Sequence, residues 1–127
     1  GLDYSGHLKG EEELDVKAAL IMCPVPFHQW SYTRGGREYR GVRTVQYTYA
    51  RDLQGPWLLY DNHADPFQQN NLVDNEEFSD SLTELEAELE KLLAMTGDKF
   101  PSGPELMEAW DYDWDNNDDS IPPVQQR

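Results

Sequence analysis

Residues 39–72, YRGVRTVQYTYARDLQGPWLLYDNHADPFQQNNL, contain two strand-like runs joined by a turn. The run 41–51 alternates between two sets of side chains, and successive side chains of a strand point to opposite faces of a sheet. The run 57–60 is short and apolar. Residues 52–56 between them supply turn formers, and Pro56 has no amide hydrogen for a central ladder, so we expect it at the start of a strand. An antiparallel hairpin is the simplest connection.

A long amphipathic helix is predicted over residues 74–96. Asp74 is the expected N-cap, with Glu77 three residues later as in a capping box, and Gly97 is the expected C-terminal stop. Apolar side chains recur at steps of four and three and form one stripe: Phe78, Leu82, Leu85, Leu89 and Leu92. A single stripe suits a helix that lies on one face of a sheet.

The remaining strands are expected from shorter patterns. Residues 17–25 contain an apolar run bounded by prolines, which favours a buried strand. A fourth short strand is expected from the region 110–114 or from the first residues. The predicted fold class is therefore α+β, with a small antiparallel sheet of about four strands and one long helix packed on it. We divide the chain into a linker over residues 1–16, a domain over 17–100, and an acidic tail containing Pro and Gln over 101–127.

The composition of the chain limits the classes of partner that it is expected to bind. The chain has 127 residues, the size of one domain, and a formal net charge of -15. This charge disfavours nucleic acids and anionic membranes as partners, because phosphate binding needs clustered Lys and Arg. No apolar run approaches the length of about 18 residues that indicates a membrane helix. The chain begins with Gly, and we expect it to be a piece of a longer protein. Bacterial cytoplasm and periplasm both remain open as the compartment.

Three patterns in the sequence resemble sites that carry chemistry. Cys23, the single cysteine, ends an apolar run and is expected to be a buried structural thiol rather than a nucleophile. The three histidines have no further ligand at metal-binding spacing. Asp111, Asp113 and Asp115 resemble the start of a calcium loop, but its sixth and twelfth positions lack the Gly and Glu that such a loop requires. We therefore predict no metal site in this chain.

The loop 27–38 gathers aromatic and cationic side chains in an otherwise acidic chain. Its candidate substrate-lining residues are His28, Trp30, Arg34 and Arg37. The guanidinium of Arg suits planar anions such as carboxylate, phosphate or sulfate, and Trp offers a stacking face. An ordinary surface loop with salt bridges is the alternative.

The order of motifs resembles a known family. The strand Tyr39-Arg40-Gly41-Val42-Arg43-Thr44 with Tyr47 and Tyr49, the run Gly55-Pro56-Trp57-Leu58-Leu59-Tyr60-Asp61, then Asp65-Pro66 and Asn71-Leu72 occur in this order. This pattern is similar to the C-terminal subdomain of type I sulfatases, formylglycine-dependent members of the alkaline phosphatase superfamily. The similarity covers about residues 1–100, and residues 1–10 resemble the linker from the large catalytic domain. Two positions depart from the pattern, since Gln68 stands where Glu is frequent and Thr48 where Lys is common.

The resemblance implies a part of a sulfate-ester hydrolase. Such enzymes use a formylglycine, made from Cys or Ser in a C/S-x-P-x-R motif, and a calcium ion. The segment from Cys23 fails that motif, because Val25 stands in place of Pro and Phe27 in place of Arg. The resemblance therefore implies that both groups belong to a missing N-terminal sulfatase domain, the expected partner, and that this fragment has no catalytic residue and is inert alone. The substrate of the full-length enzyme would be a sulfated small molecule or sugar.

Two other interpretations remain open from the residues. A phosphonate or phosphate-ester hydrolase of the same superfamily is one, because phosphate and sulfate esters are close in shape and charge. The other is a free-standing acidic interaction module that binds basic partners through residues 105–119. Whether the chain is part of an enzyme therefore stays open at this point.

Overall fold

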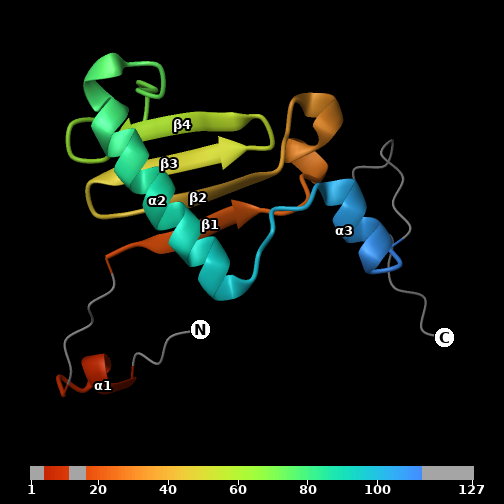
Figure 1. Cartoon of the computed structure of the whole chain (residues 1–127), viewed down its shortest axis with the longest axis horizontal. Coiled ribbons are helices and arrows are strands. Elements are labelled where there is room, and N and C mark those ends of the chain that lie inside the picture. The colour runs from red at the N-terminus through yellow and green to blue at the C-terminus, as the bar shows by residue number, and fades with distance from the viewer. Residues whose placement is uncertain (1–4, 12–16, 113–127) are drawn as a thin grey trace.

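A four-stranded sheet with one long helix across it forms the centre of the molecule. The computed structural model describes residues 5–11 and 17–112. Figure 1 shows helix α2 on one face of the sheet and helix α3 beyond one end of it. The elements in chain order are α1 (Ser5–Leu8), β1 (Ala19–Cys23), the 3-10 helices η1 (His28–Trp30) and η2 (Tyr32–Arg34), β2 (Tyr39–Arg43), β3 (Tyr47–Asp52), β4 (Gly55–Asp61), the 3-10 helix η3 (Glu76–Phe78), α2 (Ser79–Thr96) and α3 (Gly103–Ala109). The predicted α+β fold is confirmed.

The sheet has the order β1-β2-β3-β4, and every neighbouring pair is antiparallel. One row of side chains runs across it from strand to strand through Leu20, Val42, Tyr49 and Leu59. The last three of these are fully buried beneath α2. The predicted strand in residues 17–25 is confirmed as β1. Pro56 lies at the second position of β4, an edge strand, where its missing amide hydrogen is tolerated.

The prediction of one strand over residues 41–51 is wrong, because this run forms two strands. The chain turns back between β2 and β3, where the Tyr47 amide donates to the Thr44 hydroxyl at 2.8 Å and the Thr44 amide donates to the Tyr47 carbonyl at 2.8 Å. Val45 at the tip of this turn is 81 % exposed. The alternating pattern continued through the turn because a side-chain hydroxyl, rather than Gly or Pro, closes it.

This split also supplies the fourth strand. The expectation that it would come from the region 110–114 or from the first residues is therefore wrong for the described parts of both. Trp110 follows α3 as its C-cap, and Ser5–Leu8 is helical. Residues 1–4 and 113–114 lie outside the described residues.

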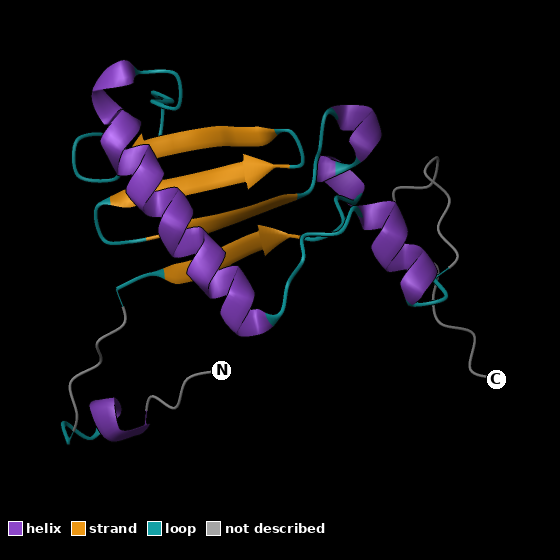
Figure 2. Ribbon diagram, in the orientation of Figure 1, coloured by secondary structure: helices purple, strands orange, loops and turns teal. Residues whose placement is uncertain are grey.

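Helix α2 covers the sheet with the predicted stripe. Leu85 and Leu89 are buried at its centre, and the remaining predicted members of the stripe pack partly buried around them. Leu93 is also buried, although the stripe was predicted to end on Leu92. Figure 2 shows α2 lying obliquely across the strands, which brings its last turns over β1. Because burial of a leucine side chain stabilises a fold by about 1.5–3 kcal/mol, these contacts are the main energetic link between helix and sheet.

The ends of the helical segment follow local capping rules. The segment begins with η3, for which the side chain of Asn75 accepts a hydrogen bond from the Glu77 amide at 3.0 Å. The cap is thus Asn75 rather than the predicted Asp74, and α2 itself starts at Ser79. Gly97 ends the helix with a φ of 69°, as predicted, since this left-handed conformation suits glycine.

Two arginines tie the helical side of the sheet to the rest of the chain. Arg40 is 2 % exposed, its Nε donates to the Asp98 carboxylate at 2.5 Å, and its guanidinium lies 4.7 Å from the Phe100 ring centre. Arg51 forms ion pairs with Glu86 and Glu90 of α2. A buried charge costs several kcal/mol unless it is paired, so the Arg40–Asp98 pair fixes the path of the chain after α2.

Helix α3 was not predicted. Ser102 and Glu105 form a capping box at its start. The buried carboxylate of Glu38 accepts a hydrogen bond from the Gly103 amide at 2.6 Å and one from the Tyr32 hydroxyl. These contacts attach α3 to the loop between β1 and β2. In the described part of the chain, no helix is long and apolar enough to cross a membrane.

Candidate functional site

The face of the sheet opposite α2 forms a shallow hollow. We call it the open face and define it by the residues that line a cavity of about 400 Å³: Ile21, Cys23, Trp30, Tyr39, Arg43, Thr48, Ala50, Trp57, Leu58, Tyr60 and Gln68. Most of these come from the four strands. Among the described residues, only the ends of the hollow receive side chains from elsewhere, Trp30 from η1 and Gln68 from the segment after β4.

A bulge in β4 delivers Trp57 to the open face. Ala50 pairs with Leu58, but the next residue of β3, Arg51, pairs with Pro56, so Trp57 has no partner of its own. An extra residue in one strand re-aims the side chains next to it. Trp57 and its neighbour Leu58 consequently line the same hollow, which strict alternation along the strand would not allow.

An aromatic and cationic cluster surrounds Trp57. The rings of Trp30 and Trp57 are stacked, with their centroids 6.1 Å apart and an angle of 27° between planes. Tyr39 packs at 5.8 Å from the same ring. The guanidinium carbon of Arg37 lies 4.8 Å from the Trp57 centroid, and its Nη1 pairs with Asp52 at 2.7 Å. The structure thus brings together two of the four predicted residues, Trp30 and Arg37.

The other two predicted residues, His28 and Arg34, do not line the hollow. Both are exposed, on η1 and η2. His28 has a φ of 55°, a conformation uncommon for residues other than glycine, and it begins the first 3-10 turn. The loop therefore presents a cation and an imidazole outward, beside the stacked tryptophans rather than among them.

A neutral polar cluster occupies the other end of the open face. The Gln68 amide nitrogen donates to the Thr48 hydroxyl at 3.0 Å and to the Asn62 side-chain oxygen at 3.0 Å. The Thr48 hydroxyl in turn donates to that oxygen at 2.9 Å. Thr48 and Gln68 are the two departures from the sulfatase pattern, and they are in direct contact. An amide–hydroxyl contact therefore stands where the pattern would place lysine and glutamate.

Arg43 gives the open face its cationic group. Its Nη1 lies 3.3 Å from the Thr48 hydroxyl, and Arg43 as a whole is exposed. Among the described residues, no carboxylate lines the hollow, so Arg43 faces only neutral groups there. Arg43, Tyr39 and Trp57 were missed as site residues. The signal that could have found the last two is the register between strands, which the sequence does not give once the turn at Thr44 is overlooked.

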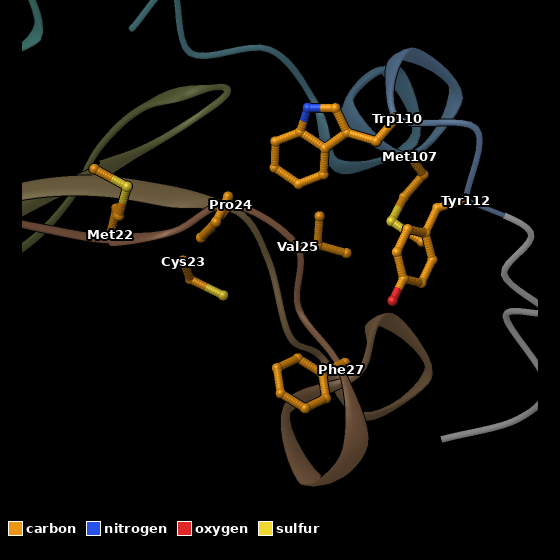
Figure 3. Close-up of a pocket in the computed structure, with 8 residues that line it drawn as sticks. All are labelled: Met22, Cys23, Pro24, Val25, Phe27, Met107, Trp110 and Tyr112. Atoms are coloured by element: carbon orange, nitrogen blue, oxygen red, sulfur yellow. The ribbon is translucent and has the colours of Figure 1, made fainter. Parts of the chain in front are cut away.

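A second, apolar groove begins beside Cys23 and runs toward α3 (Figure 3). It has a volume of about 410 Å³, and Figure 3 shows Trp110, Met107 and Tyr112 on the side of α3, opposite the end of β1. Burial raises the pKa of the Cys23 thiol, and the negative charge of Glu38 raises it further. The thiol is half-buried rather than fully buried, and the raised pKa favours its unreactive protonated form.

No group of three or more His, Cys, Asp or Glu side chains that could hold a metal ion occurs among the described residues. Asp113 and Asp115 of the calcium-loop pattern lie outside the described residues. The residues present also do not fit a formylglycine, because the segment after Cys23 departs from its motif at Val25 and Phe27.

Comparison with known proteins finds similarity to sulfatases. The chain is 40% identical over 125 residues to an ulvan-active sulfatase from Formosa agariphila, a match that covers 96% of this chain and 23% of the relative. A solved structure from Bacteroides thetaiotaomicron, provisionally described as a sulfatase, shares the fold with a TM-score of 0.63. It is 23% identical, and the match covers 79% of this chain and 21% of that protein. No protein-family profile matches the chain.

These matches distinguish between the interpretations that the sequence left open. They do not favour a phosphate-ester hydrolase or a free-standing acidic module. The chain spans less than a quarter of the length of the curated relative. Over nearly its whole length the chain is therefore similar to part of a sulfatase, and it corresponds to a C-terminal part of that relative.

Proposed function

We propose that this chain completes the fold of a sulfuric ester hydrolase by packing on its larger catalytic domain. The observation that carries the proposal is the 40% identity to an ulvan-active sulfatase over 125 residues. Because the chain spans 23% of that relative, the proposed partner is the part that the match leaves out, which we take to be an N-terminal sulfatase domain. A small sheet with one face under α2 and an apolar open face suits this role, since an apolar face of a sheet is stabilised by packing against another element.

The chemistry is proposed to reside in that partner. A formylglycine and a calcium ion are the groups that the family resemblance implies, and the described residues of this chain fit neither. The proposed result is that the purified chain does not hydrolyse a small aryl sulfate. Turnover that persists after repurification and scales with the amount of chain would contradict the proposal.

The loop 27–38 is proposed to reach the substrate pocket of the full-length enzyme, whose substrate we propose to be a sulfated small molecule or sugar. Its ends are fixed by β1 and β2, and Trp30 is 40% exposed although it stacks on Trp57. Arg34 is exposed on η2, and its guanidinium is the proposed group for binding a sulfate oxygen. His28 is exposed on η1 of the same loop.

Kinetics of the full-length protein test this role. Arg34→Ala is expected to lower kcat/KM for the natural substrate at least about tenfold, because a hydrogen bond to a charged group contributes about 1.5–3 kcal/mol. Trp30→Ala, which removes a stacking face, should lower it as well. A small aryl sulfate, which cannot reach the outer contacts, should be affected much less. Lys91→Ala, which removes an exposed cation from α2, is the matched control. Equal losses on both substrates would assign the loop a structural role.

A further inference from the structure

The open face is built to be covered. It combines four aromatic rings, from Trp30, Tyr39, Trp57 and Tyr60, with the aliphatic side chains of Ile21 and Leu58 in one hollow. Contiguous apolar surface of this kind on a soluble domain marks a site of interaction. The face is also preorganised, since the bulge and the stacked tryptophans hold Trp57 in place without help from a partner.

The charge on this face specifies what covers it. The chain carries 25 acidic and 10 basic residues, yet no acidic residue among those described lines the hollow. Arg43 is the cation there, and the hydrogen bond that its Nη1 donates to the Thr48 hydroxyl is long, at 3.3 Å. Thr48 is buried and already engaged by Gln68 and Asn62. A guanidinium brought into a covered apolar hollow requires an anionic partner, because an unpaired buried charge is strongly unfavourable.

We propose that the open face is the surface on which the rest of the sulfatase packs, and that this partner places a carboxylate against Arg43. The inference rests on the proposed function, because that function supplies the partner. The match covers 23% of the relative, so a polypeptide about three times as long as this chain remains available to cover the face. The neutral pair of Thr48 and Gln68 leaves Arg43 available for a carboxylate from the partner instead of one from this chain.

The test uses a chimera in which the matching 125 residues of the Formosa agariphila sulfatase are replaced by this chain. Hydroxyl-radical footprinting compares side-chain oxidation in the chimera and in the 127-residue chain alone. Tyr39 and Tyr60, which are half-buried on the open face, should be oxidised several-fold more slowly in the chimera. Met95, 81% exposed at the end of α2, is the internal control and should react equally in both.

Arg43→Glu in the chimera should abolish this protection, whereas Lys91→Glu, the same charge change on α2, should preserve it. Arg43→Gln, which removes the charge without reversing it, gives a second variant should the first fail to fold, and is expected to reduce the protection. Equal oxidation of the two tyrosines in chimera and chain would overturn the proposal. So would protection that appears in the isolated chain only as its concentration is raised, which would indicate a second copy as the occupant.

The activity of the same chimera separates this inference from the proposed function. An active chimera without protection refutes the docking surface and leaves the sulfatase role intact. A chimera that is protected but does not hydrolyse sulfate esters supports the docking surface and contradicts the proposed function.

Discussion

The contact between Thr48 and Gln68 can be tested by exchanging both residues for those that the sulfatase pattern places there. Gln68→Glu alone replaces the amide nitrogen that donates to Thr48 and to Asn62, both at 3.0 Å, with an acceptor facing the Asn62 oxygen. Loss of these bonds in a partly buried site is expected to cost about 1–3 kcal/mol of unfolding free energy. Thr48→Lys alone removes the hydroxyl and places an ammonium beside Arg43, which should also destabilise the chain.

The double variant should recover part of that loss, because the new ammonium and carboxylate can pair. The expected coupling between the two substitutions lies above about 0.5 kcal/mol, within the usual range of about 0.5–3 kcal/mol for residues in contact. Urea unfolding of the 127-residue chain, followed by tryptophan fluorescence and far-UV circular dichroism, gives the four free energies of the cycle. Thr48→Lys combined with Gln54→Glu, in the turn between β3 and β4, is the control pair and should be additive. Additivity within about 0.5 kcal/mol for Thr48 and Gln68 would refute the interpretation of these residues as a compensating pair.

Three further predictions test the fold. Leu89→Ala, at a fully buried site on the sheet-facing side of α2, should lower the free energy of unfolding in urea by about 2–5 kcal/mol, whereas Met95→Ala at an exposed site should change it by less than about 0.5 kcal/mol. Burial alone would raise the pKa of Asp98, but the hydrogen bond from Arg40 and a backbone amide hold it below its ordinary value of 3.8. The folded state therefore favours the charged carboxylate of Asp98. The stability that this carboxylate contributes is fully present above pH 3.8 and is lost as the pH falls through the lowered pKa. Asp98→Asn should therefore flatten this part of the acid-unfolding curve. Gly103→Ala should loosen the attachment of α3, because a β-carbon there would force the Tyr32 hydroxyl to move, and faster hydrogen exchange in residues 103–109 would reveal it.

The parts of the fold that follow from local periodicity were predictable. The leucine stripe of α2 and its Gly97 stop required only the spacing of residues along one helix. The β2–β3 turn was not predictable in the same way, because Val45 and Gln46 continue the alternation of the flanking strands while the Thr44 hydroxyl closes the chain on itself. Because the turn was not predicted, β2 and β3 were predicted as one strand, and the fourth strand of the sheet was sought elsewhere in the chain.

The site could be predicted only where its residues are neighbours in the chain. Trp30 and Arg37 lie on the same loop, so the sequence alone suggested that they form one cluster. Their common partner, Trp57, lies on β4 and faces them because of a bulge, which no local residue pattern predicts. The contact of Thr48 with Gln68 had a weak signal, since both depart from the same pattern, but it takes the folded chain to show that the two departures touch.

Restoration of sulfatase activity tests the central claim most directly. The Formosa agariphila relative is prepared without its matching 125 residues, and again with those residues replaced by this chain, and both are assayed on ulvan beside the intact relative. The account predicts that the truncated protein is inactive or unfolded and that the chimera hydrolyses sulfate esters. A folded chimera without activity, or a truncated protein as active as the intact one, would contradict the claim that this chain completes a sulfatase.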